Sequence, residues 1–173
     1  HSYTDALDGA ASDVTVGVLA EGFGHDQSES GVDTTVREAL SAFEAAGATV
    51  EEVSIPMHLD GMPIWNAIAT EGTMATVEAE GIGYNAGGAY DTQFMEAFAH
   101  ARRAHGNDYL ATVKLTLIMG QHLSEKYHSH YYAKAQNLSR ELARRYDNAL
   151  EEVDVLAMPT TPQTAHAYTE DLT

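Results

Sequence analysis

The chain has 173 residues, and its 26 Asp and Glu against 9 Lys and Arg give a formal net charge of −17. This length allows one domain with a substantial hydrophobic core, and the apolar fraction of 44% argues against a wholly disordered chain. The negative charge argues against binding to nucleic acids or membranes, no apolar run is long enough to span a bilayer, and the lack of cysteine excludes disulfides and thiolate chemistry.

The acidic residues are concentrated in residues 1–100, where 17 of them accompany a single basic residue, Arg37. They are scattered rather than gathered in one block, and only three lysines occur in the whole chain. This composition favours a protein adapted to a high-salt cytoplasm, where salt screens the self-repulsion. The alternative is a surface for cationic ligands or a basic partner, which the scattered pattern favours less.

The first segments predict a βαβ unit over residues 13–55. Asp13–Leu19 is apolar and rich in valine, which is typical of a buried strand. A helix is expected over Thr34–Ala46, with Asp33 as its N-cap. Ala48–Ile55 is a second expected strand, and the short links between these elements imply that the two strands are parallel.

The middle of the chain predicts a helical region over residues 63–151, with a glycine-rich connector at Gly81–Gly88. The expected helices cover Pro63–Glu80, Asp91–His105, Asp108–Leu123 and Ser129–Glu151. In the last of them, apolar residues recur at steps of three and four, which predicts a core face. That face comprises Tyr131, Ala135, Leu138, Leu142, Tyr146 and Ala149.

A final strand is expected over Val153–Met158, followed by the PTTP segment that ends at Pro162. The order of elements predicts a single α/β fragment over residues 1–173. Its parallel or mixed sheet has few strands and is covered by several helices. Because the chain begins at His1 without a methionine, we expect an excised or processed fragment.

No self-sufficient catalytic motif is present: the chain lacks G-x-S-x-G, H-E-x-x-H, the Walker A loop and S-x-x-K. His122, His128 and His130 lie close together, but they straddle an expected helix break and no acid stands at ligand spacing. The glycines at 22 and 24 lack the third glycine of a dinucleotide fingerprint. The sequence therefore predicts neither a metal nor a cofactor.

Trp65 is the only tryptophan, and it lies near the start of an expected helix beside Ile64 and Ile68. Two interpretations remain open for it. A large apolar side chain at this position packs in a core by default, whereas the alternative is the wall of a ligand pocket.

Four segments, taken together and in order, resemble the second half of amidases of the amidase signature family. They are VGVLAEGF at 16–23, ATVEEVSIPMHLDGMPIW at 48–65, YYAKAQN with YDNAL at 131–150, and DVLAMPTTP at 154–162. The YYAKAQN segment is closer to stand-alone amidases than to the A-type components of tRNA-linked glutamine amidotransferases.

The resemblance implies a part of the larger α/β/α amidase fold and the hydrolysis of a carboxamide to a carboxylic acid and ammonia. Family members use a Ser-Ser-Lys arrangement located in their first half. This chain has no Gly/Ser-rich signature and no Ser-Ser pair, and none of its lysines matches the catalytic one. We therefore expect no catalytic residue in it and no activity of the fragment alone.

Pocket residues are nevertheless implied. The flanks of Trp65 (GMPIWNAI) are similar to the family segment that walls the acyl pocket, and Thr160 and Thr161 are weaker candidates. The expected partners are a small amide substrate in the parent enzyme and the missing N-terminal half. A fragment that contains only part of a sheet would leave apolar faces exposed, and we therefore also expect it to self-associate.

Two other functions remain open: a non-catalytic binding or regulatory module, and the structural half of a split enzyme. Within the family, the A-type component of a glutamyl-tRNA amidotransferase is a further alternative.

Overall fold

The computed structural model describes residues 4, 11–82 and 87–167. The chain forms two compact units, His1–Leu59 with Leu142–Thr173, and Asp60–Glu141. The helical region predicted over 63–151 contributes to both units. The expected glycine-rich connector lies partly outside the described residues, at 83–86.

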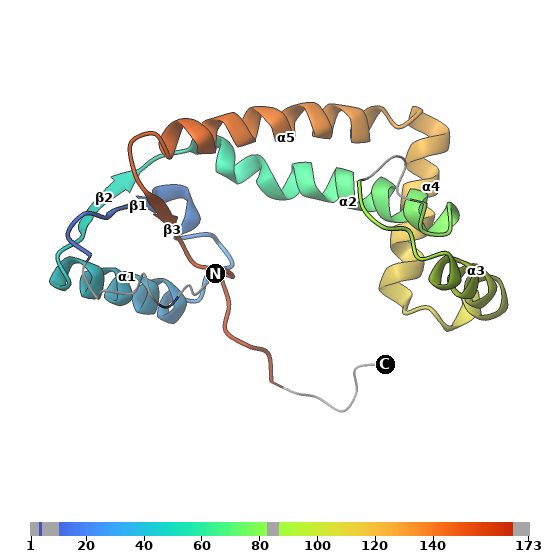
Figure 1. Cartoon of the computed structure of the whole chain (residues 1–173), viewed down its shortest axis with the longest axis horizontal. Helices are drawn as coiled ribbons and strands as arrows, with labels where there is room; N and C mark the ends of the chain where they lie inside the picture. The colour runs from blue at the N-terminus through green and yellow to red at the C-terminus, as the bar shows by residue number, and fades with distance from the viewer. Residues whose placement is uncertain (1–3, 5–10, 83–86, 168–173) are drawn as a thin grey trace. The chain divides into compact units, whose positions relative to one another are not determined.

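The first unit contains a three-stranded parallel sheet, with strands β1 (Thr15–Leu19), β2 (Thr49–Val53) and β3 (Val155–Ala157) in the order β2-β1-β3. Figure 1 shows these strands side by side. The central strand is buried because both of its edges are paired. The arrangement confirms the predicted α/β fold and resolves its sheet as parallel.

Helix α1 (Ser30–Ala45) connects β1 to β2 and completes the βαβ unit. It begins four residues earlier than predicted, and the expected N-cap role of Asp33 is wrong. Glu29 occupies the N-cap position. The Asp33 carboxylate instead accepts a hydrogen bond of 2.9 Å from the backbone N–H of Gly24, where the chain turns with φ +68°.

The core of this unit is a small apolar cluster between the sheet and α1. Its buried members are Val16, Val18, Phe23, Leu40 and Ala48. The guanidinium of Arg37 lies 4.2 Å from the centre of the Phe23 ring. The only basic residue among the first hundred therefore covers an aromatic core residue from α1.

The second unit is helical, with α2 (Gly61–Glu78), α3 (Thr92–His105), α4 (Ala111–Tyr127) and the first part of α5 (His130–Ala149). Helices α2 and α4 pack closely, because a glycine stands at their contact. A Cβ atom at Gly120 would lie 2.6 Å from both the Met74 Cβ and the Thr70 carbonyl oxygen.

Helix α4 ends later than predicted, and the break before α5 consists of His128 and Ser129, which both have left-handed backbone conformations. Glu71 of α2 is 97% buried beside this corner, and its carboxylate accepts a hydrogen bond of 3.2 Å from the Tyr132 N–H. Tyr132 lies in the first turn of α5, whose N–H groups have no partner within the helix. A side chain from another helix thus caps α5.

The predicted core face of α5 is only partly correct. Ala135 is buried, and Leu142, Tyr146 and Ala149 are half-buried. Tyr131 and Leu138 are exposed. The spacing identified the face of α5 that carries the buried residues. It could not predict how many residues along that face the neighbouring elements bury. Among the described residues, no helix is both long enough and apolar enough to cross a bilayer.

Candidate functional site at the carboxyl ends of the strands

Polar side chains gather where β1 and β2 end. Glu21 lies in the 3₁₀ turn Ala20–Gly22 directly after β1, Ser54 follows β2, and His58 lies in the next 3₁₀ turn, Pro56–Asp60. The carboxyl ends of parallel strands lie at one edge of a sheet, where α/β proteins bind their ligands. This edge is therefore the first place to look for a site in the first unit.

Glu21 joins the ends of the two strands. Its Oε1 accepts a hydrogen bond of 2.6 Å from the Ser54 hydroxyl, and its Oε2 accepts one of 2.8 Å from the Ile55 N–H. Although burial alone would raise the pKa of Glu21, these hydrogen bonds outweigh it and hold the pKa below its ordinary value. The carboxylate is therefore ionised at neutral pH.

His58 makes the second link, to the end of α5. Its Nδ1 lies 2.5 Å from the hydroxyl oxygen of Tyr146, and the ring of His25 lies 6.4 Å away, centre to centre. Burial lowers the pKa of His58, and the nearby His25 lowers it further, against the opposite effect of Glu21. Burial raises the pKa of Tyr146, as does the charge of Glu21.

These contacts tie elements together but do not form a catalytic relay. In a serine hydrolase, a histidine takes the proton of the serine and an acid orients the histidine. Here Ser54 donates directly to the carboxylate of Glu21, and Nδ1 of His58 faces a tyrosine. Because neither contact activates a nucleophile, the cluster fixes the strand ends relative to α5.

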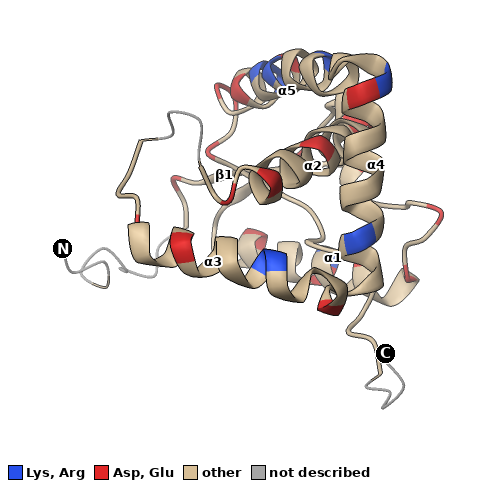
Figure 2. Cartoon of the chain, turned by 90° about the vertical axis from the view of Figure 1, so that its right-hand side faces the viewer, with Lys and Arg blue, Asp and Glu red and all other residues tan. Residues whose placement is uncertain are grey.

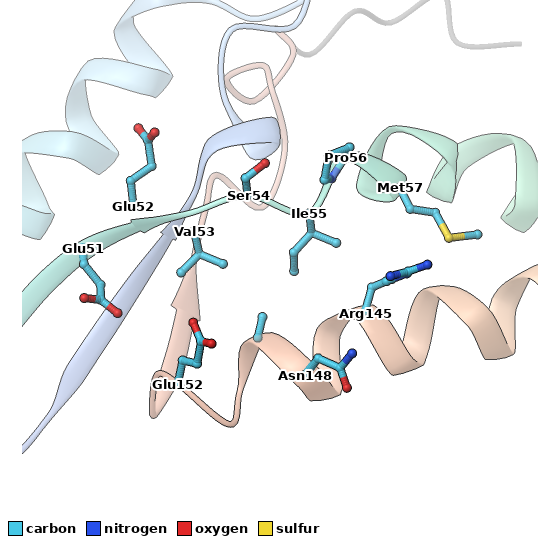
Figure 3. A pocket seen from close by; sticks show the side chains of 11 residues that line it. Glu51, Glu52, Val53, Ser54, Ile55, Pro56, Met57, Arg145, Asn148 and Glu152 are labelled. Carbon is cyan, nitrogen blue, oxygen red and sulfur yellow. The ribbon is translucent and has the colours of Figure 1, made fainter.

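An open pocket of about 640 Å³ lies beside the cluster, between the end of β2 and the end of α5. In Figure 3, Val53 and Ile55 point toward α5, which supplies Arg145 and Asn148 to the opposite side. The acidic side chains around it are Glu51, Glu52 and Glu152. The pocket combines an apolar wall with a mainly acidic rim.

Trp65, the strongest candidate from the sequence, is 59% exposed on α2, so it is not a core residue. It borders a hollow of about 290 Å³ between α2 and α4, with Asn66, Thr70 and Val113 among the other lining residues. Its position suits the wall of a pocket.

The other pocket candidates, Thr160 and Thr161, follow β3 in the first unit, whereas Trp65 belongs to the second. Both threonines are exposed, and the Thr161 hydroxyl donates a hydrogen bond of 2.8 Å to the carbonyl oxygen of Gln163. Their contribution to a substrate pocket remains a prediction, as does that of Trp65.

The histidines of the α4–α5 corner are separated by the helix break. His122 lies within α4, His128 at its end and His130 at the start of α5, and the His122 ring packs edge-on against Tyr127. Among the residues that the structure describes, no group of three or more His, Asp or Glu is placed to hold a metal ion.

The sequence did not single out the strand-end cluster. A partial signal was present, because Glu21 lies two residues after the first expected strand and Ser54 lies near the end of the second. No local pattern predicted the contact of His58 with Tyr146, since 88 positions separate the two residues.

Comparison with known proteins gives a consistent result. The Amidase family model matches residues 1–172. An enantioselective amidase of Rhodococcus rhodochrous is 42% identical over 149 residues, which cover 86% of this chain and 29% of that enzyme. The A-type component of the glutamyl-tRNA(Gln) amidotransferase of Natronomonas pharaonis is 36% identical over 163 residues, or 93% of this chain and 37% of the relative.

A solved structure agrees with these relatives. The crystal structure of the A-type component of the glutamyl-tRNA(Gln) amidotransferase from Thermotoga maritima superposes with a TM-score of 0.53 at 27% identity. The match covers 95% of this chain and 30% of the crystallised one. The chain thus spans about a third of the length of these relatives.

Proposed function

Because the chain belongs to the amidase family, we propose that it forms part of an amidase that hydrolyses a carboxamide to a carboxylic acid and ammonia. The observation that carries this proposal is the 42% identity with the enantioselective amidase. The parent enzyme is then a hydrolase of C–N bonds, and its substrate is a small amide.

In this proposal the chain contributes structure and pocket wall rather than catalytic groups. The hydroxyl of Ser54 is held by the carboxylate of Glu21, whose lowered pKa makes it a weak base, which favours a supporting role for the strand-end cluster. Trp65, with Thr160 and Thr161, lines the substrate pocket of the complete enzyme. The nucleophile and its base come from the part of the relatives that this chain does not match.

A second candidate is the A-type component of an amidotransferase, which works with partner chains. It is supported by the relative from Natronomonas pharaonis, whose name describes one component of such a complex. The higher identity with the enantioselective amidase favours the first candidate. Under either candidate we expect a cytoplasmic protein, and the acidic composition agrees with the cytoplasm of a high-salt cell.

The direct test is an assay of ammonia release from aliphatic and aromatic amides at molar KCl, with the purified chain. We expect no turnover. If turnover persists after repurification and is lost in the Trp65→Ala variant, the proposal that this chain lacks the catalytic groups is wrong.

The coding sequence around the chain tests the parent enzyme separately. A Gly/Ser-rich stretch with paired serines within about a domain length upstream would support the amidase. A start codon at His1 and a stop codon after Thr173 would favour a short binding module or a split enzyme instead.

A further inference from the structure

Helix α2 holds both arms of the corner between α4 and α5. On the α4 side, Gly120 lies against Thr70 and Met74. On the α5 side, the neighbouring residue Glu71 accepts a hydrogen bond of 3.2 Å from the Tyr132 N–H. Figure 2 shows α2 in the angle between α4 and α5, in agreement with these two contacts. One short stretch of α2 therefore fixes the angle of the corner.

The corner itself has a strained backbone. His128 and Ser129 have φ values of 53° and 55°, a left-handed conformation that is unfavourable for residues other than glycine. Residues in such a conformation persist only where the surrounding structure holds them there. The corner therefore depends on the contacts that α2 makes with its two arms.

Ser129 stands where a helix cap is expected, directly before the first residue of α5. A serine at this position normally accepts a hydrogen bond from the N–H two or three residues later, and its backbone is then extended. In the left-handed conformation, its hydroxyl oxygen instead lies 3.3 Å from that of Ser124 in α4. Glu71 binds the Tyr132 N–H that an extended Ser129 would bind. Two side chains therefore compete for one donor.

The use of Glu71 as the cap has a cost that a local serine cap would avoid. The residue is 97% buried, and its second oxygen, Oε2, has no hydrogen-bond partner among the residues that the structure describes. A buried polar oxygen without a partner destabilises a fold. Ser129 would cap the same donor without placing a carboxyl group in the interior. Glu71 therefore contributes a specific conformation of the corner rather than stability alone.

We propose that Glu71 is a latch that selects between two conformations of this corner. In the latched conformation, which the structure shows, Glu71 caps α5 and the corner is left-handed. In the released conformation, Ser129 is extended and caps Tyr132 itself. The start of α5 then moves away from α2, while Gly120 keeps α4 against α2. The corner is thus a hinge for α5, the helix that contributes to both units. This proposal does not depend on the amidase assignment.

The first test measures the distance between α2 and α5 in the full chain. Because the chain has no cysteine, Thr76→Cys and Lys134→Cys place one spin label on each helix, both at exposed positions. Pulsed electron paramagnetic resonance should give a single distance when Glu71 is present. Glu71→Gln keeps an acceptor for the Tyr132 N–H and should keep this distance, whereas Glu71→Ala should shift the distribution to a longer one. An unchanged distribution in Glu71→Ala would overturn the proposal.

The second test determines whether Ser129 replaces Glu71 as the cap. In the original chain the Ser129 hydroxyl does not cap α5, so Ser129→Ala should change the Tm little. In the Glu71→Ala chain the same substitution removes the replacement cap, and it should lower the Tm by about 2–4 °C more. An equal effect of Ser129→Ala in both chains would mean that the two side chains do not compete, and the latch would then be wrong.

A third test leaves Glu71 unchanged. Glycine adopts the left-handed conformation without steric cost, so Ser129→Gly should favour the latched corner and raise the Tm by about 2–4 °C. Ser139→Gly, inside α5, is the control and should lower the Tm, because glycine weakens a helix interior. If Ser129→Gly also lowers the Tm, Ser129 is an ordinary cap of α5 and the proposal is overturned.

Discussion

The Tyr146 hydroxyl oxygen lies 2.5 Å from Nδ1 of His58, which joins the end of α5 to the turn that follows β2. Neither residue is fully exposed, so water does not freely replace either partner. In the neutral imidazole, Nδ1 accepts a hydrogen bond from the Tyr146 hydroxyl or donates one to it, according to the tautomer. The contact is therefore one of the bonds that hold the carboxyl edge of the sheet in place.

Removal of that hydroxyl should destabilise the protein. Tyr146→Phe keeps the ring but leaves Nδ1 of His58 without its partner, which costs about 1–2 kcal/mol in the free energy of unfolding. Urea titration at molar KCl, followed by circular dichroism, measures this difference. Tyr90→Phe, at an exposed tyrosine, is the matched control and should change the value by less than about 0.5 kcal/mol. Equal stability of the two variants would show that the bond contributes nothing.

Acid should weaken the same region through His58. The pKa of this imidazole is lowered in the folded protein, first by burial and then by His25. As the pH falls below the ordinary value of 6.5, the unfolded chain takes up a proton that the folded protein resists. The stability that neutral His58 provides is thus complete above this pH and declines below it, until the pH has passed the folded-state pKa.

Urea midpoints from neutral to mildly acidic pH measure this decline. His58→Gln removes the titrating group and should flatten the pH dependence below 6.5. His100→Gln is the comparison, because His100 is exposed on α3 and pairs only at 3.9 Å with Glu96. If His58→Gln and the original chain lose stability in parallel, His58 is not the source of the effect.

The α2–α4 contact predicts a strong effect at Gly120. A methyl group there would lie 2.6 Å from the Met74 Cβ and the Thr70 carbonyl oxygen, neither of which is a flexible side-chain end. The better helix propensity of alanine stabilises by about 1 kcal/mol, but overpacking costs about 1–3 kcal/mol or more. We expect Gly120→Ala to be destabilised by about 1–2 kcal/mol in urea titration.

Gly31→Ala is the control for this change. Gly31 lies in the first turn of α1 and has no atom within 4 Å of an added Cβ, so alanine should stabilise by a few tenths of a kcal/mol. A Gly120→Ala protein as stable as the original would mean that the two helices can separate at little cost.

The sequence predicted the sheet well because the signal is local there. The apolar run that ends at Leu19 is buried along almost its whole length, and the short links to the second strand leave only a parallel arrangement. The start of α1 was predicted less well, because Asp33 has the residue type of an N-cap but is bound by the turn at Gly24. When an aspartate has backbone N–H donors both in a helix and in a nearby turn, the residue type alone does not predict which of them it binds.

The candidate site was predictable only in part. The flanking residues of Trp65 predicted a pocket wall; the structure places this side chain exposed beside a hollow, and its role in a substrate pocket stays a prediction. The contact between His58 and Tyr146 depends on how α5 returns to the sheet, and no spacing in the sequence encodes that return. The helix α4 was predicted from its sequence, but only its contact with α2 at Gly120 shows which of its faces is covered.

Salt should stabilise the protein because of where its charges lie. Residues 1–100 carry 17 acidic side chains and one basic one, so their mutual repulsion destabilises the folded state at low ionic strength. Raising KCl to about 1 M shortens the screening length to about 3 Å and removes most of this repulsion. For a chain of this size each kcal/mol gained raises the Tm by about 2–4 °C, and we expect a total rise of about 5–10 °C.

A charge-reduced variant separates screening from other effects of salt. Glu51 and Glu52 are exposed neighbours on β2, and the double change Glu51→Gln/Glu52→Gln removes two of the acidic charges. This variant should melt at a higher temperature than the original chain in dilute buffer and gain less from added KCl, because less repulsion remains to be screened. A Tm that is unchanged between dilute buffer and molar KCl would show that the acidic composition has no role in adaptation to salt.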